Sequence, residues 1–199
     1  MTERRAFGWV AGGTLAVWAV HNAWLGPIEA RAGVPEPLLL ALRAVVWLGP
    51  ALGYLRRCDP RPLGEALAVT TRPSPGGTAA ALALGAAWVA TIGAATGAAP
   101  QLHDVGWRLV GVLLEELLMR GFLFGQLARW IRGRAALATA ALFAAMHVPG
   151  WLADGLAPEA LVPSVVVVGI LGLVLGFGRH WSRSIWPGVL VHLANNLLG

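Results

Sequence analysis

Seven long apolar segments run through this chain of 199 residues and leave it few charges with which to face water. Hydrophobic residues make up 57% of the sequence and charged residues only 13%, whereas about one quarter of a soluble domain is charged. Because about 20 apolar residues in a helix span the hydrocarbon core of a bilayer, the pattern predicts an all-α, polytopic transmembrane helical bundle in one domain, 1–199. The expected helices, about seven in number, cover residues 6–26, 38–55, 79–98, 106–128, 134–150, 162–179 and 184–198.

The segments and the loops between them differ in character. The last three segments are short for a membrane span, so we expect them to tilt little or to thin the bilayer. The first segment follows Arg4 and Arg5 as a signal peptide would, but its apolar stretch is too long and no cleavage site follows, so we expect an uncleaved helix. The loop 56–78 is rich in Arg, Pro and Gly, and we expect it outside the membrane with a short surface helix at 63–69.

Positive charge alternates along the connecting segments. Arginines cluster before the first apolar segment and after the second, fourth and sixth. The other connections are neutral or acidic and hold Glu29, Arg31, Glu36, His103, Asp104, Asp154 and Glu159. The positive-inside rule then predicts a cytoplasmic N-terminus and a C-terminus on the far side, in an integral protein of a bacterial inner membrane. The arginines lack interleaved aromatic residues, so we expect the lipid bilayer as their partner and no nucleic acid.

The fourth segment contains "EELLMR", which places Glu115, Glu116 and Arg120 in an apolar run. A charge at mid-membrane costs about 2.5–3.5 kcal/mol on insertion scales, so three unpaired charges would be expensive. Residues four apart share a helix face, so Glu116 and Arg120 can form an ion pair. Glu115 lies about 100° further round the helix and faces another neighbour. One interpretation is that these charges only hold helices together.

Two later segments add polar groups at a similar depth. "LFAAMHVPG" places Phe143 and His147 on one helix face, and "LVHLANN" does the same for His192 and Asn196. Counted along each helix from the nearest arginine cluster, these groups and Glu115 lie about 15–20 Å into the membrane. Intramembrane ionisable groups are functional candidates, so we expect one site. His21 in the first segment is expected to be an ordinary core histidine.

A carboxylate, two imidazoles and an amide suit hydrolysis. A carboxylate with a histidine can take a proton from water, and histidine with asparagine can donate hydrogen bonds to a developing oxyanion. The sequence contains neither G-x-S-x-G nor H-E-x-x-H, and its single cysteine, Cys58, falls in a loop.

These motifs resemble those of the CAAX-protease and bacteriocin-processing (CPBP, or Abi) family of intramembrane proteases, which includes the type II CAAX prenyl endopeptidases. The resemblance rests on "EELLMR", "FAAMH" and "HLANN" in that order, with "RGFLFGQL" and "SIWPGVLVHLANN" around them, and covers about residues 107–199. It implies that Glu115 is the general base that activates water with His147. Glu116 and Arg120 would support and position that base, and His192 with Asn196 would form the oxyanion site.

The resemblance leaves the use of a metal open, because both a metalloprotease and a metal-free glutamate mechanism have been argued for this family. Glu115, His147 and His192 could supply three zinc ligands and leave one coordination position open. We expect no tightly bound zinc, because the carboxylates are partly committed to Arg120 and the sequence shows no second partner for either histidine.

The expected partner is a peptide or membrane-associated protein substrate, while the sequence does not indicate an oligomeric state. Two other functions stay open. A catalytically silent relative, acting as a scaffold or bacteriocin self-immunity factor, would keep the fold but should lose motif residues, and all are present. A proton-coupled transporter would more often have broken helices near the midplane, and we expect no Gly or Pro break beside the charges here.

Overall fold

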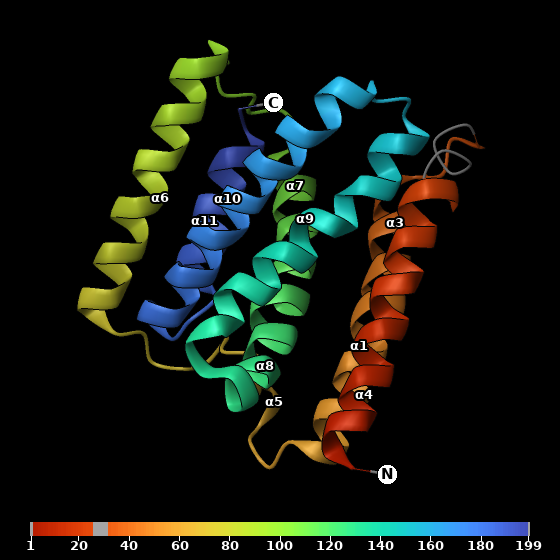
Figure 1. Cartoon of the computed structure of the whole chain (residues 1–199), viewed down its shortest axis with the longest axis vertical. Coiled ribbons are helices and arrows are strands. Elements are labelled where there is room, and N and C mark those ends of the chain that lie inside the picture. The colour runs from red at the N-terminus through yellow and green to blue at the C-terminus, as the bar shows by residue number, and fades with distance from the viewer. Residues whose placement is uncertain (1, 26–31, 199) are drawn as a thin grey trace.

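The structure, a computed structural model, is a bundle of antiparallel helices and describes residues 2–25 and 32–198 (Figure 1). Its first half contains α1 (Glu3–Val20), the π-helical turn η1 (His21–Leu25), α3 (Glu36–Arg43), the π-helical turn η2 (Ala44–Leu48), α4 (Gly49–Cys58), the short α5 (Leu63–Ala66) and α6 (Pro75–Thr96). Its second half contains α7 (Val105–Glu116), the π-helical segment η3 (Leu117–Leu123), α8 (Phe124–Ile131), the 3-10 turn η4 (Arg132–Arg134), α9 (Ala135–Ala153), α10 (Pro158–Ser182) and α11 (Trp186–Asn196). The all-α prediction is confirmed, and the described residues include no strand.

Helix lengths differ from the expectation in one respect. The sixth segment was expected to be short, but α10 has 25 residues and runs from Pro158 to Ser182. The hydrophobic run stops at Arg179, whereas the helical hydrogen bonds continue through the polar residues beyond it. The length of the apolar segment therefore predicted the part of this helix that suits the hydrocarbon core, but not the polar residues at its ends.

Four continuous helical stretches in the described ranges are long and apolar enough to cross a membrane, as expected of an integral membrane protein. They are Glu36–Cys58, Pro75–Thr96, Val105–Ala153 and Pro158–Ser182. The third stretch contains two of the predicted segments, because the chain reverses direction at η4 between α8 and α9 (Figure 1). Neither α1 nor α11 is among the four.

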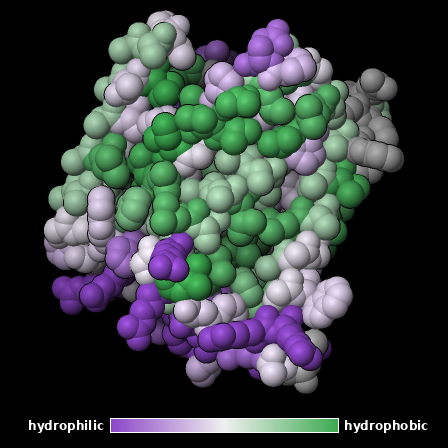
Figure 2. Space-filling model, viewed as in Figure 1, coloured by the Kyte–Doolittle hydropathy of each residue, from purple (hydrophilic) through white to green (hydrophobic). Residues whose placement is uncertain are grey.

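The two chain termini lie at opposite ends of the bundle (Figure 1). We call the N-terminal end the basic end, since residues 2–5, 56–74, 129–134 and 179–183 gather there. Figure 2 shows hydrophilic residues along this edge and a broad hydrophobic band beyond it. Because the arginine-rich connections alternate with the others along the chain, they all come to lie at one end of the bundle. Glu29 and Arg31 lie outside the described residues, and the membrane side of each end stays a prediction.

The close approach of α9 and α10 depends on small residues. A Cβ atom added to Gly172 would lie 2.9 Å from the Cα atom of Ala140, and one added to Gly176 would lie 3.2 Å from that of Ala136. Small residues at this spacing let two membrane helices pack backbone against backbone. This contact fixes α9, and hence His147, against the helix that follows it.

The loop between α4 and α6 is not the surface feature that its composition suggested. Ala66, Leu67 and Ala68 are at most 7% exposed. A Cβ atom added to Gly121 would lie 3.1 Å from the Leu67 carbonyl oxygen, so the loop backbone touches η3. The indole Nε1 of Trp186 donates to the Val69 carbonyl over 2.9 Å. We call residues 63–69 the plug, because they close the basic end beneath α7 and α11.

Candidate active site

The ion pair that the i, i+4 spacing predicted is present at the junction of α7 and η3. Arg120 Nη1 donates to Glu116 Oε1 over 3.0 Å, and both side chains are fully buried. The other guanidinium nitrogen, Nη2, donates to the Gly172 carbonyl of α10 over 3.4 Å. A buried ion pair needs such additional hydrogen bonds to offset the loss of hydration. The pair therefore fixes α7 to α10.

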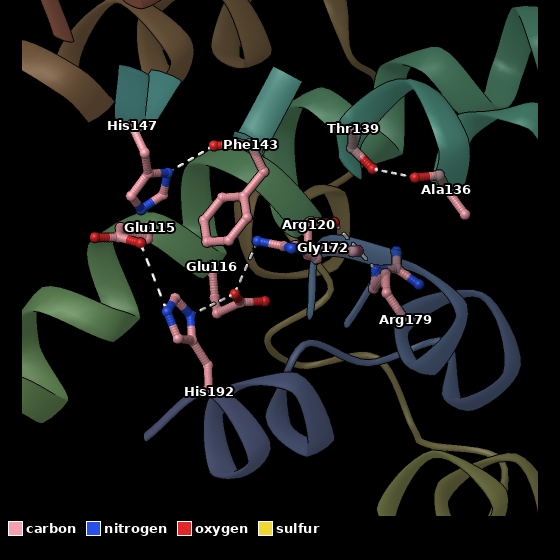
Figure 3. A network of polar contacts seen from close by, with 10 residues as sticks. All are labelled: Glu115, Glu116, Arg120, Ala136, Thr139, Phe143, His147, Gly172, Arg179 and His192. Carbon is pink, nitrogen blue, oxygen red and sulfur yellow. Dashed lines mark hydrogen bonds and ion pairs between the residues drawn. The ribbon is translucent and has the colours of Figure 1, made fainter. Parts of the chain in front are cut away.

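His192 on α11 lies between the two glutamates (Figure 3). Its Nδ1 atom is 3.0 Å from Glu116 Oε1, and its Nε2 atom is 3.7 Å from Glu115 Oε2. A carboxylate accepts, so Nδ1 carries the proton toward Glu116 and Nε2 faces Glu115. Glu115 has 22% of its side chain exposed, whereas Glu116 is fully buried. The neighbour that Glu115 faces is therefore His192, with a separation just beyond hydrogen-bond length.

His147 reaches the same region from α9, oriented by its own helix. Its Nδ1 atom lies 2.7 Å from the Phe143 carbonyl oxygen, which can only accept, so Nδ1 is the protonated nitrogen. In the neutral ring this leaves the Nε2 lone pair available. His147 and His192 have different hydrogen-bond partners but share one neighbour. The Phe143 ring lies edge-on to both imidazole rings, with its centroid 4.8 Å from that of His147 and 5.6 Å from that of His192.

Phe143 is a site residue that the sequence reasoning did not name as such. Besides contacting both histidines, its ring lies 4.4 Å from the Arg120 guanidinium carbon. A cation over an aromatic face is attracted by the ring quadrupole, most strongly when both are desolvated. The signal was present in the spacing of Phe143 and His147, but only the fold shows that Arg120 and His192 meet the same ring.

Asn196, at the end of α11, joins the site across a cavity of about 690 Å³ that Glu115 also lines. Its side-chain oxygen accepts from Asn195 Nδ2 over 3.3 Å, and its backbone carbonyl accepts from Arg108 on α7. The cavity lies at the end opposite the basic end, where α3 and α7 begin and α11 ends. The Asn195 side-chain oxygen accepts a hydrogen bond from Trp88 Nε1 over 2.9 Å. The sequence analysis missed Arg108 and Asn195 because both make their contacts with residues distant in sequence.

His21 behaves as expected of a core histidine: it is 4% exposed, and its Nε2 atom accepts from Arg43 over 3.1 Å. The four groups in direct contact are therefore Glu115, Glu116, Arg120 and His192. His147 joins them through Phe143, and Asn196 joins them through the cavity.

Residues 105–198 match the family described as type II CAAX prenyl endopeptidase Rce1-like. The match covers slightly less than half of the chain, and through these residues the chain is similar to the Rce1-like family. The matched region begins with α7, ends two residues after α11 and includes all six residues of the candidate site. No curated protein and no solved structure matched the chain. The Rce1-like family is a family of proteases.

One expectation about this site is wrong, and one set of contacts could not be read from the sequence. The sequence showed no second partner for either histidine, and in the structure Nδ1 of His147 faces the Phe143 carbonyl and Nδ1 of His192 faces Glu116. The helices were expected to lack a break beside their charges. Instead Pro149 lies inside α9, two residues after His147, and the π-helical η3 follows Glu116 directly. Such π-helical segments often occur at functional sites.

The candidate ligands are of the right chemical type for zinc, but they are not arranged around one point. Carboxylate and imidazole groups are zinc ligands, and the partners at both Nδ1 atoms would orient Nε2 for binding. Within residues 2–25 and 32–198, however, no three His, Cys, Asp or Glu side chains converge closely enough to hold a metal ion. As the side chains lie, the site does not fit a bound metal.

Proposed function

We propose that this chain is an intramembrane endopeptidase that hydrolyses a peptide bond in a membrane-associated, lipid-modified or peptide substrate. The observation that carries the proposal is the buried network of Glu116, Arg120 and His192 beside a second carboxylate, Glu115, that faces a cavity. A buried network of this kind holds its members in one geometry, which is what general acid–base catalysis requires.

In the proposed reaction Glu115 takes a proton from water, because it is the carboxylate left free by the ion pair and reached by the cavity. The Nε2 lone pair of His147 helps to orient that water. His192 lies between the two carboxylates, with Nδ1 toward Glu116 and Nε2 toward Glu115, and when Nε2 carries a proton it is a hydrogen-bond donor. As it loses this proton, the water oxygen attacks the peptide carbonyl carbon, and His192 and the Asn196 amide donate to the oxygen of the tetrahedral intermediate. Glu115 then gives the proton to the leaving amine as the C–N bond breaks, which releases an acid and an amine.

The position of the cavity suggests the side from which a substrate enters. The cavity lies opposite the basic end, and the plug closes the basic end. If the basic end is cytoplasmic, as the positive-inside rule predicts, the substrate arrives from the outer side of a bacterial inner membrane. Reporter fusions after residues 72 and 132 should then read cytoplasmic, and a fusion at 155 should read external. A cytoplasmic signal at 155 would contradict both the topology and the entry side.

The activity is tested by comparing the peptides released from membranes that carry the intact chain, Glu115→Gln or Glu36→Gln. Glu36 lines the same cavity but is 48% exposed and lies outside the buried network, so it serves as the matched control. We expect a processed peptide with the intact chain and with Glu36→Gln, and none with Glu115→Gln. Identical peptide profiles in all three membranes would refute the endopeptidase and favour a silent relative.

A further inference from the structure

A second cavity, of about 640 Å³, lies at the basic end between α1 and α4, away from the candidate active site. Arg56 and Arg57 form its charged part, and Trp9, which is 77% exposed, stands at its edge. α1 and α4 run antiparallel and contact each other along this end (Figure 1). The cavity is thus built into the bundle at the level where a membrane helix leaves the bilayer.

The two arginines of this cavity are not neutralised by the protein. In the described part of the chain neither Arg56 nor Arg57 has an ion pair, although acidic residues lie nearby. Asp59 is bound by Arg61 over 2.7 Å, and Glu3 by Arg129 over 2.6 Å. The local acids are therefore committed to other arginines, and the cavity keeps two positive charges for an anion.

The other wall of the cavity is apolar and extends along the helix. From Arg57 to Pro50 the α4 backbone rises by about 10 Å, at about 1.5 Å per residue, and Val10 of α1 lines the cavity with Pro50. The headgroup layer of one leaflet is only about 5–8 Å thick, so the cavity continues into the hydrocarbon region. Tyr54 lies between the two parts, and its buried hydroxyl has no hydrogen-bond partner among the described residues.

We infer that this cavity binds one anionic phospholipid, with its phosphate at Arg56 and Arg57 and one acyl chain along Val10 and Pro50. Basic pockets between membrane helices bind anionic headgroups, and an exposed tryptophan is suited to the interface beside them. A free phosphate ion would satisfy the arginines but not the apolar wall. The length and two-part character of the cavity therefore favour a lipid.

The test measures binding of phosphatidylglycerol, phosphatidylcholine and glycerol phosphate to the purified full chain in a neutral detergent, by native mass spectrometry. We expect phosphatidylglycerol to bind in preference to the other two. Because each arginine near a headgroup contributes about fivefold, Arg56→Gln/Arg57→Gln should weaken that binding by about 25-fold. Arg5→Gln/Arg72→Gln removes two exposed arginines from the same end outside the cavity and should change binding little.

A second pair of variants tests the apolar part without altering charge. A Cβ atom at Gly53, which lines the cavity, or at Gly13, which does not, would meet no atom within 4 Å. Gly53→Leu should fill the cavity and abolish lipid binding, whereas Gly13→Leu should bind as the intact chain does. Equal loss with the Arg5/Arg72 control, equal binding of phosphatidylcholine, or full binding by folded Gly53→Leu would each overturn the proposal. Glycerol phosphate binding as well as the lipid would show an anion site only.

Discussion

Replacing Arg120 with methionine would leave a carboxylate in the centre of the bundle without its counter-ion. In the intact chain Nη1 donates to Glu116 over 3.0 Å, Nη2 donates to the Gly172 carbonyl, and both charged side chains are fully buried. Removing one partner of a buried ion pair typically costs about 3–5 kcal/mol of stability. The guanidinium also lies over the Phe143 ring, and a desolvated cation–π contact contributes about 2 kcal/mol.

We expect Arg120→Met to lower the free energy of unfolding by about 4 kcal/mol. The energies of the ion pair and the cation–π contact are not summed, because both involve the same guanidinium group. At about 2–4 °C per kcal/mol for a chain of this length, the thermal midpoint should fall by roughly 10 °C. Adding Glu116→Gln removes the stranded charge and should restore about 2–3 kcal/mol of that loss. The double variant would therefore be more stable than Arg120→Met alone.

The assay is thermal unfolding of the four proteins of this double-mutant cycle in one detergent. Arg5→Met, at an exposed position of α1 without an ion pair among the described residues, controls for the loss of an arginine. A midpoint for Arg120→Met within about 2 °C of the intact chain would refute the reasoning. So would effects of Arg120→Met and Glu116→Gln that add to within about 0.5 kcal/mol, the usual result for independent sites.

Four further predictions concern other parts of the chain. Glu115→Gln should abolish peptide processing without lowering the unfolding midpoint, because Glu115 is partly exposed and outside the ion pair. Asn196→Ala should lower the rate of peptide processing by about 100- to 1000-fold and leave measurable activity. The purified chain should hold zinc well below one ion per molecule, and metal analysis that finds one equivalent, lost in His147→Ala, would contradict this expectation. Hydrogen bonds from Arg61 and Gln126 hold the pKa of Asp59 below its ordinary value of 3.8, so its contribution to stability is complete above about pH 4 and is lost as the pH falls further. Unfolding midpoints measured between pH 6 and 3 should therefore fall more steeply for the intact chain than for Asp59→Asn.

The membrane helices could be predicted because each of them is a long apolar run, and the i, i+4 rule was enough to pair Glu116 with Arg120. The plug could not be predicted in the same way. Its residues lie in an Arg-, Pro- and Gly-rich loop, and Leu67 can pack against η3 because Gly121 lacks a side chain there. That contact joins positions distant in sequence, so no local pattern reports it.

Within the candidate site, the residue types could be found from their motifs, whereas their partners could not. Spacing along α9 placed Phe143 and His147 on one face, but the contact of Phe143 with Arg120 requires α7 to lie against α9. The π-helical η3 was missed for a related reason. Apolar periodicity averages over several turns, and one wider turn after Glu116 changes it too little to be seen.

The plug also bears on how such a chain can coexist with an energised membrane. Water that entered the cavity would reach Glu115, and a path that continued from there to the basic end would let ions or protons leak across the membrane. Beyond the cavity, Leu118 and Met119 are completely buried, and beneath them lie the plug residues Ala66 and Leu67. Packed apolar side chains therefore separate the cavity at Glu115 from the basic end of the bundle, as a membrane protein needs if it admits water on one side without letting ions through.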